Sequence, residues 1–230
     1  MFRGLVVLSL LILAFPCFAY SQYQPIPILM YHHIVDNRKG DLYLPAKVFN
    51  KHLDFLQQNG YLTVTFNDVL KGRTREKSVV LTFDDGTWTH WWVANELERR
   101  GMKGVFFISS GLIDRDPFLS RQKITKMSQM GHEIGSHSVS HPYLTKIDYA
   151  KLFEEVKLSK MSLEELIDRP VISFAYPFGE YNKEVIRWVE KAGYHYARTT
   201  DEGISIWGQE KNFRLKIIYI HSNTIDLKLR

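Results

Sequence analysis

The sequence predicts an α/β fold built on a largely parallel sheet. Short apolar runs of strand length alternate with segments of helical periodicity, which is the order expected of repeated β–α units. Neither an internal repeat nor a low-complexity segment interrupts this alternation after residue 25. Polar residues that could carry chemistry follow directly on predicted strands, as they do at the carboxyl end of a β/α barrel or of an open doubly wound sheet. Periodicity alone does not choose between these two architectures.

Each predicted element has a local cause. Pro45 suits the first turn of a helix, because its fixed φ fits that position, and Gly60 ends this helix. Further glycines end three later helices. The predicted helices are one from Pro45 to Gly60, a short one capped by Asn67, and residues 88–100, 121–130, 146–168 and 183–192. The predicted strands are residues 26–31, 61–66, 78–83, 104–109, 132–135, 170–176, 194–199 and 215–220.

Length and charge narrow the functional classes. A chain of 230 residues can build one sizeable domain, or two small ones. The net charge is +5, and lysine and arginine are scattered among acids rather than clustered with aromatic residues. We therefore expect no nucleic-acid binding, since that function favours a concentrated basic face. No feature indicates an obligate protein partner.

The amino-terminal residues predict export. Residues 1–19 have the pattern of a secretory signal peptide, with a positive Arg3, an apolar run and small residues before a cut after Ala19. We expect a periplasmic or extracellular protein, and the alternative is an uncleaved N-terminal membrane anchor. Because Cys17 is the only cysteine, the mature chain would contain no disulfide bond.

Two carboxylates stand at the end of the strand predicted at residues 78–83. Asp84 and Asp85 lie next to a low-dielectric core, where unpaired charge is costly. His137 and His141 are four apart, so a helical turn would point both rings to one side. Two imidazoles and one carboxylate make a three-ligand set typical of catalytic zinc sites, and if Asp85 binds the metal, Asp84 is free to accept a proton. The alternative is a strand end at which Asp84 caps the next helix.

These segments resemble the polysaccharide deacetylase family, the NodB-homology domain of carbohydrate esterase family four. Residues 82–86 (Thr-Phe-Asp-Asp-Gly) and 137–142 (His-Ser-Val-Ser-His-Pro) match two of its motifs. Residues 26–33 are similar to the start of its secreted bacterial branch, which includes poly-N-acetylglucosamine deacetylases. The resemblance implies a single-domain, deformed (β/α) barrel. Residues 78–230 would be the NodB-homology domain, and residues 20–77 the N-terminal part of the same catalytic fold.

The resemblance also implies roles for individual residues. Asp84 is expected to be the general base, and Asp85, His137 and His141 to bind a divalent metal, in first place zinc, with cobalt or nickel as alternatives. The expected activity is the metal-dependent removal of acetyl groups from an N-acetylated glycan. His221 matches the histidine that protonates the leaving amine in the family's last motif, and a histidine without function after an edge strand is the alternative.

The family's third motif is altered in this chain. Its aromatic, proline and glycine pattern is present, and the resemblance implies that Tyr176, Pro177 and Phe178 bind substrate. The backbone N–H of Phe178 would face the developing oxyanion, a role that needs no side-chain hydroxyl. The arginine that orients the base is replaced by Ala175, and either Arg198 or Arg214 is a candidate substitute.

Several residues remain open to two interpretations. For the adjacent His32 and His33 there are two interpretations. Either one of the two imidazoles lines the cleft beside the metal, or both are strand-end histidines that hydrogen-bond the backbone. The tryptophans in residues 88–92 stack on sugar rings or belong to the core, and their helical spacing favours the core. His90 and His195 are expected to be structural or exposed. The predicted function is an N-deacetylase of an amino-sugar polymer; the alternatives are a deacylase of another ester or amide, and a glycan-binding protein that has lost turnover.

Overall fold

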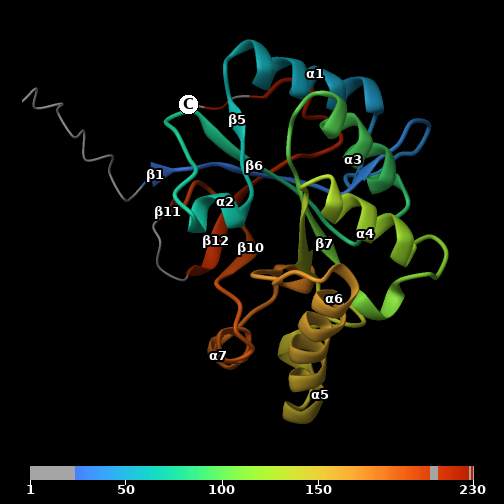
Figure 1. Cartoon of the computed structure of the whole chain (residues 1–230), viewed down its shortest axis with the longest axis vertical. Coiled ribbons are helices and arrows are strands. Elements are labelled where there is room, and N and C mark those ends of the chain that lie inside the picture. The colour runs from blue at the N-terminus through green and yellow to red at the C-terminus, as the bar shows by residue number, and fades with distance from the viewer. Residues whose placement is uncertain (1–23, 208–211, 228, 230) are drawn as a thin grey trace, which may run out of the picture.

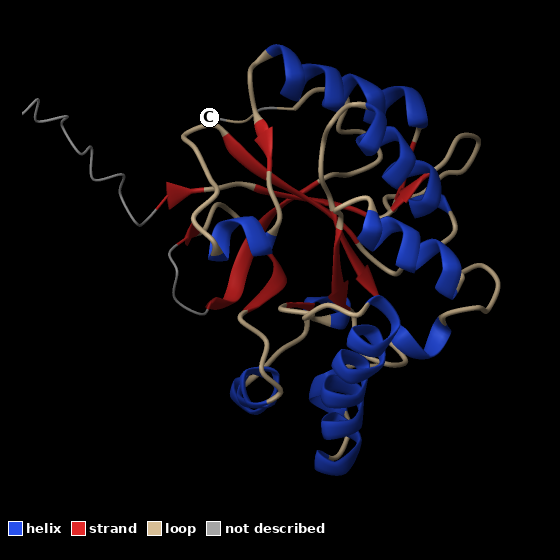
Figure 2. Cartoon of the chain, in the orientation of Figure 1, coloured by secondary structure: helices blue, strands red, loops and turns tan. Residues whose placement is uncertain are grey.

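Seven parallel strands close into a barrel with helices around its outside (Figures 1 and 2). The structure is a computed structural model and describes residues 24–207, 212–227 and 229. Around the barrel the order of strands is β2 (Ile28–Tyr31), β12 (Asn212–Tyr219), β10 (Tyr196–Glu202), β9 (Ser173–Ala175), β8 (Glu133–Ser136), β7 (Val105–Ile108) and β6 (Ser78–Phe83). β6 pairs with β2 in parallel and closes the ring. The predicted deformed (β/α) barrel is confirmed, and the open sheet is excluded.

Helices follow most of the barrel strands along the chain. They are α1 (Ala46–Gln58), α2 (Phe66–Leu70), α3 (Thr89–Arg99), α4 (Arg121–Gln129), α5 (Tyr149–Phe153), α6 (Ser159–Ile167) and α7 (Lys183–Lys191). Figure 1 shows α1, α3, α4 and α6 in a row along one side of the barrel. A π-helical turn, η3 (Glu154–Leu158), joins α5 to α6 into one rod.

Short elements complete the fold. β1 (Gln24–Pro25) pairs with β11 (Ile206–Trp207), β3 (His33–Ile34) pairs with β4 (Tyr43–Leu44), and β5 (Leu62–Thr63) lies beside β6. Three short 3₁₀ turns are η1 (Ser110–Leu112), η2 (Leu144–Lys146) and η4 (Pro177–Gly179).

The structure corrects three sequence predictions: the length of one strand, the cap of α2 and the continuity of one helix. The strand expected at residues 61–66 is only the two-residue β5, because Thr65 leaves it to cap α2. The Thr65 side chain accepts a hydrogen bond from the Asp68 backbone N–H, and the Asp68 carboxylate accepts one in return, so Thr65 rather than Asn67 is the cap. The helix expected at residues 146–168 is interrupted by η3.

The strands bury side chains on both faces. On β2, Leu29 and Tyr31 pack against the helical layer around Phe49, whereas Ile28 and Met30 point into the barrel, as the two-residue period of a strand requires. Phe66 of α2 stacks on Trp207 with ring centroids 5.2 Å apart, in the same inner cluster. The inner cluster thus fills the barrel with apolar side chains, and polar groups gather where the strands end.

The predicted signal peptide and Cys17 lie outside the described residues, so export remains a prediction. Within residues 24–207 and 212–227, the structure contains no helix of the length and apolar character that a membrane span requires.

Candidate active site

The residues that follow four barrel strands line one cavity of about 360 Å³. Because all these strands are parallel, their carboxyl ends meet at one end of the barrel, where β/α barrels place their active sites. The lining residues come from segments far apart in the sequence and are Met30, His32, Leu42, Asp84, Asp85, His137, His141, Tyr176, Phe178, Gly179, Thr200 and Tyr219. Of the sequence-predicted site residues, the cavity wall includes all except Pro177 and His221.

Asp85, His137 and His141 converge as one group. Asp85 Oδ1 lies 3.6 Å from Nε2 of each histidine, and the two Nε2 atoms are 3.1 Å apart. His137 Nδ1 lies 2.8 Å from the carbonyl oxygen of Ala175, and because a carbonyl can only accept, this nitrogen carries the proton and Nε2 presents its lone pair. The trio offers one carboxylate oxygen and two ring nitrogens, a donor set that fits a zinc-like dication.

The two histidines converge for a different reason than their spacing suggested. Residues 137–141 form a loop rather than a helical turn. Ser138 and His141 adopt left-handed backbone conformations, with φ of 66° and 61°, and these bends turn both rings to the same side. Asp85 is left-handed as well, with φ of 80°. Non-glycine residues in this region are strained, and such strain gathers at functional sites.

The electrostatics of the trio favour a bound cation. Burial, followed by the charge of the adjacent Asp84, raises the pKa of Asp85 to about 7. Burial lowers the pKa of His137 to about 3 and also lowers that of His141, so both rings are neutral at neutral pH. A carboxylate that resists ionisation beside two neutral imidazoles lacks a positive partner, and a dication would supply that charge.

Asp84 differs sharply from its neighbour, because it has a cationic partner. Its carboxylate is buried, and the Arg198 guanidinium donates from Nη2 to both of its oxygens. Burial alone would raise the pKa of Asp84, but Arg198, His137 and His32 together hold it at about 2. Asp84 is therefore ionised at neutral pH and does not cap the next helix, whose N-cap residue is Trp88.

Arg198 occupies the position that the altered third motif left open. It lies on β10 and pairs in register with Ala175 of β9, so the guanidinium enters the barrel from the neighbouring strand. Arg198 itself is 1% exposed, whereas Arg214 is exposed on β12. Of the two candidates, Arg198 contacts Asp84. The sequence alone did not choose between them because the choice depends on strand register.

His32 and His33 stand on opposite sides of the aspartate pair. His32 Nε2 is 4.0 Å from Asp84 Oδ2, and its side chain is 14% exposed. Among the described residues, no hydrogen-bond partner faces the buried Nδ1 of His32. His33 Nε2 is 3.9 Å from Asp85 Oδ2, and its Nδ1 lies 3.1 Å from the Thr87 hydroxyl. Both histidines thus lie at the site, an outcome that their sequence position left open.

His221 lies at the outer rim. Its side chain is 46% exposed, its nearest carboxylate is that of Glu202 at 4.0 Å, and its ring stacks on Tyr219 of the cavity wall at 4.3 Å. The Tyr219 ring lies between the rings of His221 and His32, and its centroid is 5.9 Å from that of His32. His32 is therefore the histidine that lies nearer to the aspartates. His90 is buried and bonds the His32 carbonyl, as a structural histidine would.

The third motif forms a tight turn at the cavity wall. Phe178 has φ of 58°, and its exposed ring stacks on Tyr143 at 4.0 Å and meets the edge of His141 at 4.5 Å. A side chain at Gly179 would place its Cβ 1.9 Å from the Thr200 hydroxyl, so only glycine fits there. Pro177 is buried beneath the turn, and Asn182 caps α7 rather than entering the site.

The cleft continues past the trio. A second cavity of about 330 Å³ shares Asp85 and His141 with the first, and a third of about 370 Å³ shares His33 and Thr87 with the second. Trp88, half-exposed, lines the third cavity, while Trp91 and Trp92 pack against the core. Trp88 is therefore placed where it could stack on a sugar ring, whereas Trp91 and Trp92 belong to the core.

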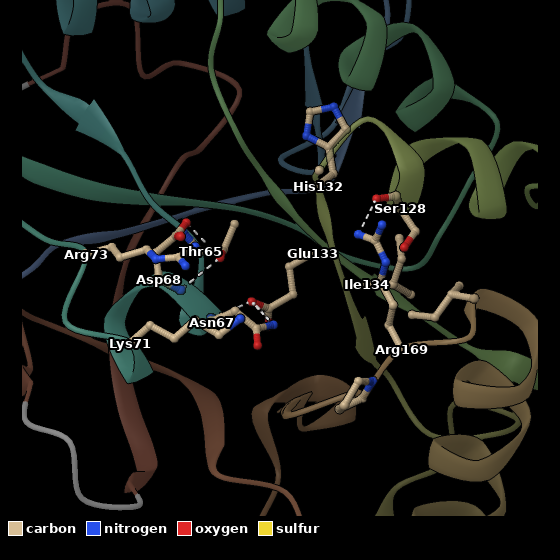
Figure 3. Close-up of a pocket in the computed structure, with 13 residues that line it drawn as sticks. Thr65, Asn67, Asp68, Lys71, Arg73, Ser128, His132, Glu133, Ile134 and Arg169 are labelled. Carbon is tan, nitrogen blue, oxygen red and sulfur yellow. Dashed lines mark hydrogen bonds between the residues drawn. The ribbon is translucent and has the colours of Figure 1, made fainter.

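A separate cavity of about 390 Å³ lies at the amino end of the barrel (Figure 3). Its buried carboxylate, Glu133, accepts hydrogen bonds from the Asn67 backbone and side chain at 2.8 and 3.0 Å and from the Ser173 hydroxyl at 2.6 Å. Arg169 donates to the Ser128 carbonyl at the other wall, as Figure 3 shows. The Glu133 bonds join α2 to strands β8 and β9, and the Arg169 bond ties the segment after α6 to α4, so these contacts have a structural role.

Comparisons with known proteins agree with this geometry. The sequence model of a family described as polysaccharide deacetylase matches residues 71–197. YxkH of Bacillus subtilis, provisionally named as a polysaccharide deacetylase, is 32% identical over 184 residues, which cover 77% of this chain and 65% of YxkH. A peptidoglycan-N-acetylglucosamine deacetylase of Bacillus cereus is 30% identical over 142 residues, covering 60% of this chain and 61% of that protein. The chain thus spans less than two thirds of both relatives.

Among solved structures, the Streptococcus pyogenes deacetylase PplD in complex with acetate superposes with a TM-score of 0.82 at 26% identity. The match covers 88% of this chain and 95% of PplD. Strands β2 and β12 lie outside the segment 71–197 that the family model matches. His32 follows β2 directly, and Tyr219 is the last residue of β12.

Proposed function

The chain belongs to the polysaccharide deacetylase family, and on this premise we propose that it is a metal-dependent hydrolase that removes N-acetyl groups from an amino-sugar polysaccharide or oligosaccharide. The observation that carries this proposal is the pairing, in one cavity, of an ionised Asp84 with the trio of Asp85, His137 and His141. One group suits proton transfer and the other suits a dication. Hydrolysis of an amide by water needs both a group that accepts the proton of the water and a cation that polarises the carbonyl.

Asp85, His137 and His141 would hold the metal. When bound, a dication lowers the pKa of a water molecule and polarises a carbonyl group. Such help is needed, because Asp84, with a pKa of about 2, is always ionised at neutral pH yet is a weak proton acceptor. Arg198 fixes the orientation of the Asp84 carboxylate, and the backbone N–H of Phe178 is proposed to donate to the developing oxyanion.

We propose His32, in place of His221, as the group that protonates the leaving amine. The pKa of His32 is lowered to about 4, mainly by burial and against the attraction of Asp84, so the ring is neutral at rest. A proton that Asp84 takes from the attacking water therefore moves downhill to His32. His32 passes it to the nitrogen as the C–N bond breaks, which returns both residues to their resting states. The 4.0 Å gap exceeds a hydrogen bond, so one water or a small ring rotation must bridge it.

The His32→Asn protein is expected to lose about 10²-fold in kcat, the lower end of the range for acid–base groups, because water reaching the ring can substitute in part. His221→Asn should change kcat by no more than a few-fold, since that ring is at the exposed rim. Steady-state kinetics on one N-acetylated oligosaccharide compare the two. A large loss in His221→Asn with a normal His32→Asn protein would return the role to His221.

The cleft supports a substrate longer than one sugar. Three connected cavities lead from Phe178 through the trio to Trp88, and exposed aromatic faces at both ends suit stacking on pyranose rings. The relatives named above include a peptidoglycan-N-acetylglucosamine deacetylase, so an envelope glycan is a candidate substrate. Acetate release should be measured on chitooligosaccharides, poly-N-acetylglucosamine and peptidoglycan fragments of matched length.

The same assay tests the alternatives. A glycan-binding protein would bind one of these glycans without releasing acetate, and a deacylase of other esters or amides would release acid only from non-glycan substrates. The reason to suspect lost turnover was Ala175, and Arg198 beside Asp84 weakens that reason. We also propose that the protein is exported and cleaved after Ala19. Intact mass of the protein recovered from the periplasm or medium should show the loss of residues 1–19, and an uncleaved chain in the membrane fraction would favour the N-terminal anchor instead.

Metal dependence is tested by measuring the metal content of the purified protein and its activity after chelation. The purified protein should contain about one dication per chain, because two histidines and one aspartate form a single site. Chelation should abolish acetate release, and zinc or cobalt should restore it. The His137→Ala/His141→Ala protein should neither bind the metal nor turn over, while His195→Ala, on the linker before β10, is the matched histidine control. Full metal content in the double variant would mean that other residues are the ligands.

A further inference from the structure

We infer that Glu155 is a positioning residue for the metal centre: its buried carboxylate, on the π-helical turn η3, holds the loop of residues 137–141 in the conformation that brings both histidines to Asp85. The inference rests on the proposed metal site. It concerns a residue that lies outside the cavity and outside the two aspartate and histidine motifs, on a different element of the fold.

Glu155 makes three hydrogen bonds to the loop. Oε2 accepts from the backbone N–H groups of Val139 at 2.9 Å and Ser140 at 2.8 Å, and Oε1 accepts from the Ser140 hydroxyl at 2.6 Å. The Glu155 side chain is 0% exposed, and Lys151 Nζ lies 3.7 Å from Oε1. A buried carboxylate that accepts three hydrogen bonds is a strong restraint, because charged acceptors bond more strongly than neutral ones.

The loop needs such a restraint. Ser138 and His141 are left-handed non-glycine residues, and conformations of this kind persist only where surrounding contacts impose them. Other bonds hold the beginning of the loop, since the His137 ring bonds the Ala175 carbonyl and the Ser138 hydroxyl accepts from the His141 backbone. Glu155 holds Val139 and Ser140, two of the three residues between the ligands. Without it, the Val139 and Ser140 N–H groups lose their acceptor. Among the described residues, the turn before His141 then keeps the Ser138–His141 bond and the bond from the Gly111 N–H to the Val139 carbonyl.

Glu155 lies on the π-helical turn, next to a glutamate that faces solvent. Glu154 and Glu155 are adjacent, yet the Glu154 side chain is 51% exposed and bonds only Lys151, at 3.0 Å, among the described residues. A π turn carries an extra residue compared with an α turn and so rotates the following side chains, and such turns are frequent at functional sites. Glu154 is therefore a matched control with the same charge, the same lysine partner and no contact with the loop.

The test compares Glu155→Ala, Glu155→Gln and Glu154→Ala in the full chain, loaded with Co²⁺ after chelation. Titration gives the Co²⁺ dissociation constant, and the visible absorption of the loaded protein reports the geometry around the ion. We expect Glu155→Ala to bind Co²⁺ about 10–100-fold more weakly, the usual effect of losing a group that orients a metal ligand, with an altered spectrum. Glu155→Gln can still accept the two backbone N–H bonds and should stay within about threefold of wild type. Glu154→Ala should match wild type.

Two outcomes would overturn the inference. A Glu155→Ala protein with wild-type Co²⁺ affinity and spectrum, even if less thermostable, would make Glu155 a structural residue only. If Glu155→Ala does not fold, Glu155→Asp decides, because it keeps the charge but is too short to reach all three donors; wild-type affinity there would equally refute the role. Failure of the metal site itself looks different, since wild-type protein would then bind Co²⁺ no better than His137→Ala/His141→Ala.

Discussion

The Asp84→Asn protein is expected to lose about 10²–10⁴-fold in kcat, with KM little changed and the metal still bound. Asp84 is fully ionised at neutral pH, because Arg198 outweighs the effect of burial and helps to keep its pKa at about 2, whereas the pKa of Asp85 is raised to about 7. An amide at this position keeps the shape and a hydrogen bond to Arg198 but cannot take a proton from water. Steady-state kinetics and metal analysis of the same preparation measure both parts.

Asp85→Asn provides the contrast. This change removes the anionic member of the trio, so metal affinity should fall and excess metal should recover part of the activity. In wild type, no loss of activity above about pH 3 should arise from protonation of Asp84, since a pKa of about 2 leaves it ionised there. If Asp84→Asn loses the metal while Asp85→Asn keeps it, the two aspartates have exchanged roles. A pure glycan-binding protein would show no turnover in any of the three proteins.

The Arg198→Met protein is expected to lose about 3–5 kcal/mol in free energy of unfolding at neutral pH, the cost of removing one partner of a buried ion pair. Arg198 is 1% exposed and Asp84 4%, so water cannot replace the lost guanidinium. Denaturant unfolding of chelator-treated protein measures the effect. Arg214→Met, at the exposed arginine of β12, is the control and should stay close to wild type. Equal losses in the two variants would contradict the assigned pairing.

The pH dependence of this loss has a definite sign. In wild type the pKa of Asp84 lies below its ordinary value, so its contribution to stability is full at neutral pH and is lost as the pH falls toward about 2. In Arg198→Met the largest charge that opposes burial is gone, so burial raises the pKa of Asp84. Folding then takes up a proton, and a lower pH reduces the loss of stability. The stability difference between the two proteins should therefore shrink as the pH falls from about 7 to about 4. Adding Asp84→Asn to Arg198→Met should remove most of the pH dependence.

Local sequence signals predicted a parallel α/β fold and placed four candidate site residues at one end of it. The alternation of apolar strands and helices predicted a parallel α/β fold, and the resemblance narrowed it to the barrel that β2 and β6 close. Asp84 and Asp85 directly follow β6, and His137 follows β8, so parallel strands had to bring them to one end. Short strands such as β5 were overestimated because a side-chain cap overrides strand propensity within a few residues.

Only the tertiary structure shows which residues contact Asp84, Asp85, His137 and His141. Arg198 reaches Asp84 because β10 pairs with β9 in the register that sets Arg198 beside Ala175, and Glu155 reaches the loop because η3 packs next to it. His32 lies beside Asp84 because β2 is inserted between β12 and β6. Sequence by itself determined which residue types could form the site, since each motif is local. Strand register and helix phase determined which residues support them, because both are set by packing between segments distant in the chain.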